Sequence, residues 1–145
     1  MPPIVLTDSC FWIGLVDPAD QYHEDSVQIF ELFSSTKGYK IVFPWPCLYE
    51  TISTRLVRRR EQTFKFENWI KELEIELFDD SMYKKGALKE VFNSLRSYGY
   101  TFSLTDGVIR EVLKDINVKI DYMITFNRRD FSDICAKRQI RIFPD

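Results

Sequence analysis

Acidic side chains stand at several places where the sequence predicts the end of a strand or the start of a helix. Asp8 follows the first predicted strand, Glu50 opens the helix after the second strand, and Asp106 lies in the first turn of a later helix. Asn127 and Asp130 follow the fourth predicted strand. Hard divalent cations prefer oxygen ligands and retain water, so two or three carboxylates with a substrate phosphate would form a Mg²⁺ or Mn²⁺ site. Such a site would activate a water molecule and stabilise a departing oxyanion.

The rest of the composition limits the kinds of catalysis and binding site that the chain can have. The chain has a single histidine, His23, which argues against two-histidine acid-base catalysis and histidine-rich zinc sites. The formal net charge is only -2, so any site for a polyanion must be a local patch. The odd set of three cysteines, Cys10, Cys47 and Cys135, contains no CxxC pair and reads as buried free thiols.

Short apolar runs alternate with helical periodicity along the chain. The predicted strands cover Ile4 to Leu6, Lys40 to Phe43, Glu74 to Phe78, Asp121 to Phe126 and Ile140 to Phe143. The predicted helices cover Phe11 to Val16, Asp20 to Phe33, Cys47 to Arg60, Glu61 to Leu73, Tyr83 to Tyr98, a helix opened by Ser103 to Asp106, and a short helix to about Lys137. Ser34, Ser35 and Gly38 should close the second helix, and Gly99 should end the helix from Tyr83. In the third helix, Leu48, Ile52, Leu56 and the nearby Val57 form an apolar stripe.

This alternation predicts an α/β fold, a three-layer α/β/α sandwich around a central, mostly parallel sheet of four or five strands. A chain of 145 residues with 45% hydrophobic residues fits one compact domain spanning residues 1–145. No run approaches the length of a membrane span and the N-terminus lacks a signal-peptide pattern, so we expect a cytoplasmic protein with no membrane contact. In such a sheet, ligands bind at the carboxyl ends of the strands, where the acids would meet.

Four stretches in order resemble the PIN-domain ribonucleases, particularly the VapC-type toxins of toxin-antitoxin systems. They are IVLTDSCFWIGL, VFPWPCLYETI, SLTDGVIREVL and DYMITFNRRDF, and the similarity extends over essentially the whole chain. The resemblance implies an endoribonuclease that hydrolyses RNA with Mg²⁺ or Mn²⁺, with Asp8, Glu50 and Asp106 as catalytic metal ligands. It also implies support from Thr125 and Ser9, a homodimer, and a small antitoxin protein that blocks the acidic rim.

The last stretch departs from the family pattern. Many relatives carry an aspartate two residues after the threonine, where this sequence has Asn127. An amide oxygen can bind a metal or its water but adds no negative charge. We expect Asn127 to support the metal ligands without binding the metal itself. Asp130 either completes the metal site or caps the following helix.

Arginines near the predicted rim are candidate RNA contacts. Arg128 and Arg129 flank the rim, and Arg58 and Arg59 lie in a basic run near the end of a predicted helix. A solvated helix end or a partner-binding surface explains that run equally well.

Other interpretations of the same residues stay open. Asp8 and Asp106 are good helix-capping residues, and Glu50, predicted to be partly enclosed, could pair with an arginine. A non-catalytic RNA-binding or scaffold module is the main alternative to the nuclease. A phospho-acceptor receiver domain is a weaker one, because Asp8 is followed by Ser9-Cys10 rather than by a second acid.

Overall fold

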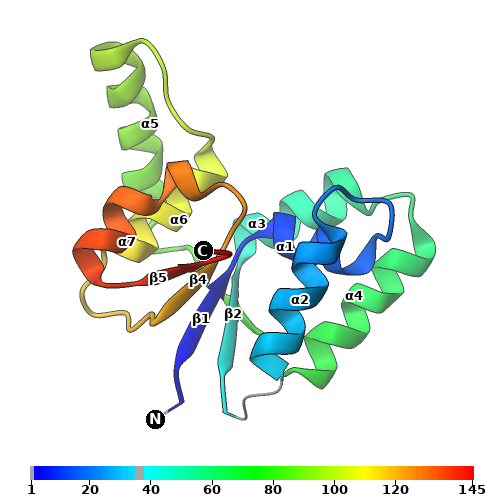
Figure 1. Ribbon diagram of the computed structural model, residues 1–145. Coiled ribbons are helices and arrows are strands. Elements are labelled where there is room, and N and C mark those ends of the chain that lie inside the picture. The colour runs from blue at the N-terminus through cyan, green and yellow to red at the C-terminus, as the bar shows by residue number, and fades with distance from the viewer. Residues whose placement is uncertain (1, 35–37) are drawn as a thin grey trace.

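The fold is built on a sheet of five parallel strands, seen in a computed structural model that describes residues 2–34 and 38–145 (Figure 1). The strand order is β3-β2-β1-β4-β5. The strands are β1 (Ile4–Thr7), β2 (Lys40–Pro44), β3 (Glu76–Phe78), β4 (Tyr122–Ile124) and β5 (Arg141–Phe143). Every pairing is parallel, as the alternation of strands and helices predicts.

Helices cover both faces of this sheet. α1, α2 and α4 lie on one side and α5, α6 and α7 on the other, which confirms the three-layer arrangement (Figure 1). The bounds are α1 (Ser9–Val16), α2 (His23–Ser34), α3 (Trp45–Glu50), α4 (Arg60–Glu72), α5 (Lys84–Tyr98), α6 (Leu104–Lys114) and α7 (Ser132–Arg138), with a π-helix η1 (Thr51–Arg55) and a 3-10 helix η2 (Arg128–Asp130). Within residues 2–34 and 38–145, no helix is long and apolar enough to span a membrane.

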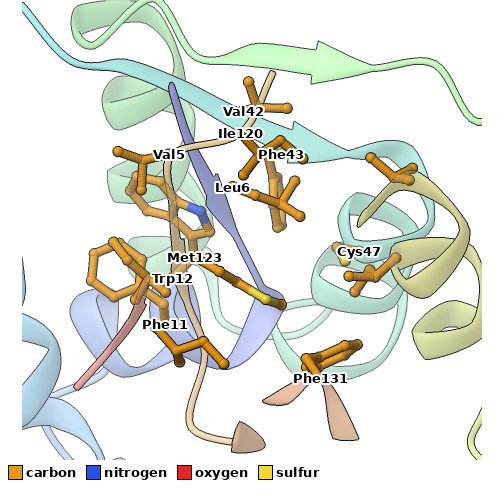
Figure 2. Close-up of a cluster of buried hydrophobic side chains, with 14 of the residues drawn as sticks. Val5, Leu6, Phe11, Trp12, Val42, Phe43, Cys47, Ile120, Met123 and Phe131 are labelled. Carbon is orange, nitrogen blue, oxygen red and sulfur yellow. The ribbon is translucent and has the colours of Figure 1, made fainter. Parts of the chain in front are cut away.

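The central strands are apolar on both faces because helices cover both. Val5 and Leu6 of β1, Phe43 of β2 and Met123 of β4 are all almost completely buried. Figure 2 shows them gathered with Trp12 and other side chains from the elements that pack on the sheet. One continuous apolar core therefore fixes the position of the strand ends.

A buried hydrogen-bond chain ties α1 to the sheet. The indole N–H of Trp12 donates to Thr7 Oγ1 over 2.8 Å, and the Thr7 hydroxyl donates to the Val42 carbonyl of β2 over 2.9 Å. Both side chains are buried, so each polar atom needs its partner. The chain fixes the end of β1 immediately before Asp8.

The helix after β2 differs from its prediction. A single helix from Cys47 to Arg60 was expected, but α3 ends at Glu50 and continues as the π-helix η1 to Arg55. The Leu56 N–H donates to the Thr51 carbonyl, a spacing of five residues that buries both of these side chains. This spacing moves the apolar stripe, and Ile52 and Val57, predicted on it, are exposed.

Other boundaries agree within a few residues. Gly99 ends α5 in the left-handed conformation, with φ 75°, and the Ser103 side chain accepts the Asp106 N–H at the start of α6. α2 begins at His23, three residues later than predicted, and the predicted closing residue Ser35 lies outside the described residues.

Replacing Thr7 with valine tests the buried chain. Thr7→Val keeps the volume but leaves the Trp12 N–H and the Val42 carbonyl without their partner, which should lower the free energy of unfolding by about 1–3 kcal/mol. Chemical denaturation followed by tryptophan fluorescence measures the change. Thr54→Val, at an exposed position, is the matched control. Equal losses in the two variants would contradict this account of Thr7.

Candidate functional site

The strand order defines where a ligand site should form. From β1 the chain forms β2 and β3 on one side of the sheet, and later β4 and β5 on the other, so the order reverses between β1 and β4. Open parallel sheets bind ligands at the carboxyl ends of the strands at such a point. Asp8 follows β1 and Thr125 follows β4, and the Thr125 hydroxyl donates to Asp8 Oδ2 over 2.9 Å.

Asp8 is a buried carboxylate, 3% exposed, surrounded by hydrogen-bond donors. Its Oδ1 accepts the Ser9 N–H at 2.6 Å and faces Ser9 Oγ at 3.2 Å, while Cys10 Sγ lies 3.5 Å from Oδ2. Burial raises the pKa of Asp8, and the nearby charge of Glu50 adds to the increase, while these donors oppose it. Asp8 is thus the N-cap of α1, as the capping interpretation holds, and it also lies at the centre of the site.

Ser9 joins Asp8 to Glu50. The Ser9 Oγ lies 2.6 Å from Glu50 Oε1 as well as near Asp8, and its single proton can serve only one carboxylate at a time. Two carboxylates therefore converge on one hydroxyl. The sequence placed Glu50 in a partly enclosed position at a helix start, which is wrong: it is exposed and is the last residue of α3.

Asp106 belongs to the same electrostatic cluster. It lies in the first turn of α6, and burial raises its pKa to about 7, with added repulsion from Asp8, Asp130 and Glu50 in that order. Carboxylates that are distant in sequence therefore influence one another across one rim. In the described residues, none of Asp8, Glu50 and Asp106 forms an ion pair with a basic side chain.

The two candidates after β4 behave differently. Asn127 is exposed, and its backbone N–H donates to Thr125 Oγ1 over 3.1 Å, which orients the hydroxyl that contacts Asp8. Asp130 closes η2, and its charge contributes to the shift of Asp106. Asp130 is therefore the residue of this loop that adds negative charge to the acid cluster. The sequence had left open whether Asp130 completes the site or caps the following helix.

The cluster suits a divalent cation in donor type and charge. Hard carboxylate oxygens with a mutual repulsion that no nearby cation relieves favour binding of Mg²⁺ or Mn²⁺. In the described part of the chain, however, no three Asp, Glu, His or Cys side chains are close enough to form a ready metal cage. The acids therefore supply the chemistry for a cation without a preformed coordination shell.

The candidate RNA-binding arginines fall into two pairs. Arg128 donates to the Ile142 and Pro144 carbonyls, and Arg59 pairs with Asp17 over 2.5 Å, so both have structural contacts. Arg58 and Arg129 are exposed, and neither forms an ion pair with any residue that the structure describes.

One contact at the site was missed by sequence reasoning. Cys47 and Cys135 are buried free thiols as predicted, but Cys10 is partly exposed and touches Asp8. The Phe126 N–H approaches Cys10 Sγ at 3.5 Å, so this thiol also meets the segment after β4. Its position two residues after Asp8, on the first turn of α1, is the signal that could have found it.

Comparison with known proteins supports the fold. No protein-family model matches the chain, and no curated protein matches it in sequence. Among solved structures, it resembles VapC20 of Mycobacterium tuberculosis, described as a toxin that cleaves the sarcin-ricin loop, with a TM-score of 0.66 and 14% identity over 89% of this chain and 94% of that one. It also resembles a chain of VapBC from Salmonella typhimurium, solved bound to DNA, with a TM-score of 0.59 and 20% identity over 98% and 97%.

A third match extends the same pattern. A chain of VapBC2 from Rickettsia felis, solved with a DNA fragment from the promoter of these proteins, matches with a TM-score of 0.61 and 14% identity over 96% of each chain. The chain therefore has the fold of the VapC toxins, which confirms the predicted PIN-like α/β/α sandwich. The alternative of a phospho-acceptor receiver domain is wrong, because such a domain has the strand order 2-1-3-4-5, whereas this sheet has the order β3-β2-β1-β4-β5.

The raised pKa of Asp106 predicts a pH dependence of stability. Between about pH 4 and pH 7 the folded protein retains a proton on Asp106 that the unfolded chain releases, so stability without metal should fall as pH rises through this window. Asp106→Asn removes this contribution and should raise the melting temperature above that of the wild type at about pH 8. Thermal melts in EDTA across this range measure both effects.

The matched control is Asp79→Asn, because Asp79 is exposed and hydrogen bonds from Ser81 lower its pKa. This variant should not gain stability above pH 7. Parallel melting profiles for wild type and Asp106→Asn would contradict the electrostatic coupling of Asp106.

Proposed function

We propose that residues 1–145 form one metal-dependent endoribonuclease domain, the toxin of a toxin-antitoxin pair. The observation that carries the proposal is the convergence of Asp8 and Glu50 on one serine hydroxyl, beside Asp106, at the ligand-binding edge of a VapC-like sheet. VapC20, which shares the fold, is described as a sarcin-ricin loop cleaving toxin. The acid cluster supports phosphodiester hydrolysis in this chain.

In this proposal Asp8, Glu50 and Asp106 hold one or two divalent cations. When bound, Mg²⁺ or Mn²⁺ would supply Lewis-acid activation of water and stabilisation of the leaving oxyanion. Ser9 and Thr125 orient the carboxylates through their hydroxyls, and Asn127 orients Thr125 in turn. No covalent enzyme intermediate is required.

The remaining candidates assist around this centre. Asp130 adds negative charge near Asp106. Arg129 and Arg58 are exposed and free to contact RNA phosphates, whereas Arg128 and Arg59 first maintain their structural contacts. A small antitoxin protein, implied by the resemblance to VapC-type toxins, would cover the acidic rim.

RNA cleavage tests the nuclease directly. Purified protein should degrade a total-RNA preparation with Mn²⁺ or Mg²⁺, and EDTA should abolish the activity. Asp8→Asn, Glu50→Gln and Asp106→Asn should each reduce the rate by at least about 100-fold, because each removes a charged ligand from the reacting centre. Gel electrophoresis of the RNA measures the rate.

The control is Glu61→Gln, which removes an exposed carboxylate of α4 far from β1 in sequence. It should cleave RNA as the wild type does. A second readout is binding: Mn²⁺ should raise the melting temperature of the wild type more than that of Asp106→Asn. Folded protein that neither cleaves RNA nor responds to Mn²⁺ would refute the proposal.

The homodimer is supported by an uncovered apolar stripe on α5. Leu88, Phe92 and Leu95, at helical spacing, are 44%, 49% and 45% exposed. Replacing Phe92 and Leu95 together by glutamate should convert a dimer into a monomer, measured by light scattering after size-exclusion chromatography. Ile116→Glu, at another exposed apolar position, should remain dimeric. A wild-type monomer would refute this part of the proposal.

A non-catalytic RNA-binding module remains the second candidate. It is favoured by the absence of a ready three-ligand cage among the described residues and by Asn127 in place of an acid. The cleavage assay separates the two, because the module would bind RNA in EDTA and leave it intact when Mn²⁺ is added.

A further inference from the structure

A pocket with aromatic and basic lining adjoins the acid cluster. It lies between α5, the segment after it, α6 and the η2–α7 corner. Tyr98, Tyr100, Thr101, Arg110, Arg129 and Asp130 are among its lining residues. Asp106 and Arg110 are four residues apart on α6 and so share one face of that helix. The pocket therefore opens along the same surface as the acids.

Two tyrosines form the exposed aromatic part of the lining, which also includes Phe102. Tyr98 and Tyr100 are 69% and 73% exposed, with ring centroids 6.2 Å apart and planes tilted by 39°. A large aromatic ring that is exposed to water lacks the stabilisation that burial would give it. These two rings flank Gly99, the residue in the left-handed conformation that ends α5. Exposed rings of this kind are surfaces on which nucleobases stack.

Arg110 forms a fixed base for the pocket. Its guanidinium makes paired contacts of 3.0 and 2.9 Å to the Asp133 carboxylate, donates to the Asp130 carbonyl over 2.5 Å, and lies 4.9 Å from the centroid of the Phe102 ring. These hydrogen bonds use three of the five guanidinium N–H donors, and the Nε–H is one of the two that remain. Arg110 Nε is buried and has no hydrogen-bond partner among the described residues.

A second polar atom at the pocket is also unpaired. Thr101 Oγ1 is buried and lacks a partner in the described part of the chain. Buried polar atoms normally have partners, and each exception needs an explanation such as a missing ligand. Only three side-chain atoms in the described residues share this state, and two of them belong to residues that line this pocket.

We propose that this pocket binds a nucleotide of the RNA substrate next to the scissile phosphate, its base against Tyr98 and Tyr100 and its polar edge near Thr101 and Arg110. The inference rests on the proposed nuclease function and assigns it a substrate subsite. Arg129, exposed at the pocket rim, provides the charge for a backbone phosphate. A single-stranded, unpaired base is required, because a base within a duplex cannot offer a ring face.

The polar character of the lining, rather than its balanced charge, fits a nucleotide better than an apolar peptide. The lining includes the basic residues Arg110, Lys114 and Arg129 and the acidic residues Glu90, Asp130 and Asp133, so the pocket has donors and acceptors rather than a continuous apolar floor. The apolar stripe of α5 is a separate surface, since none of its residues Leu88, Phe92 and Leu95 lines the pocket.

Binding of a short, fluorescein-labelled single-stranded RNA tests the subsite. Fluorescence anisotropy in EDTA gives the affinity without cleavage. The double variant Tyr98→Ala with Tyr100→Ala should bind on the order of tenfold more weakly, the loss expected for a stacked base. The pair of Tyr→Phe substitutions keeps both rings and should retain wild-type affinity.

Two further variants sharpen the result. Phe64→Ala is the matched control, because Phe64 is also an exposed aromatic ring beside an arginine but lies on α4. It should bind RNA normally. Arg129→Gln should lower the slope of log affinity against log salt concentration by about 1, as expected for one lost phosphate contact.

The outcomes separate this inference from the nuclease proposal. If the Tyr→Ala pair binds as the wild type, or if the Tyr→Phe pair loses as much as the alanine pair, the stacking subsite is refuted. The nuclease then still stands, provided that Asp106→Asn abolishes metal-dependent cleavage of total RNA. If the wild type neither binds nor cleaves RNA, both fail. Circular dichroism melts of the tyrosine variants confirm that each is folded.

Discussion

The burial of the Asp8 carboxylate is the constraint on which the rest of the site depends. A carboxylate 3% exposed has to recover its lost hydration from hydrogen bonds, and Ser9, Cys10 and Thr125 supply them. These donors come from the start of α1 and from the segment after β4. The register of β1 against β4 and the docking of α1 must therefore both be correct before Asp8 can be accommodated.

The site holds more negative charge than folding alone would favour. Burial raises the pKa of Asp106 to about 7, and repulsion from Asp8, Asp130 and Glu50 adds to the increase. Perturbed carboxylates of this kind cluster at functional sites, where binding of a ligand offsets the cost. The well-packed core around Trp12 and Phe43 provides the stability against which that cost is set.

Local signals predicted much of the fold but less of the site. Periodicity located the strands, and Gly99 and Ser103 marked helix boundaries, because these depend on neighbouring residues. The positions of Asp8 and Asp106 at strand and helix ends followed from the same signals. Glu50 was misjudged because its exposure depends on where α3 ends. Asp130 and Asp106 lie in segments that are far apart in sequence, so no local sequence pattern predicts that Asp130 raises the pKa of Asp106.

The π-helix after Glu50 separates two functions of one continuous helical segment. Compared with an α-helix of the same sequence, the extra residue in its wide turn changes which side chains face the core. The residues before η1 are positioned by β2 and the site, and Leu56 after it packs in the core. Deleting a single residue in η1 would restore the α-helical repeat, with Leu56 then four residues after Thr51 and still on the same face of the helix. A change of one residue in the length of this short segment would therefore be absorbed by the helix while Leu56 and the strands keep their positions, which makes it a place where related chains can differ in length.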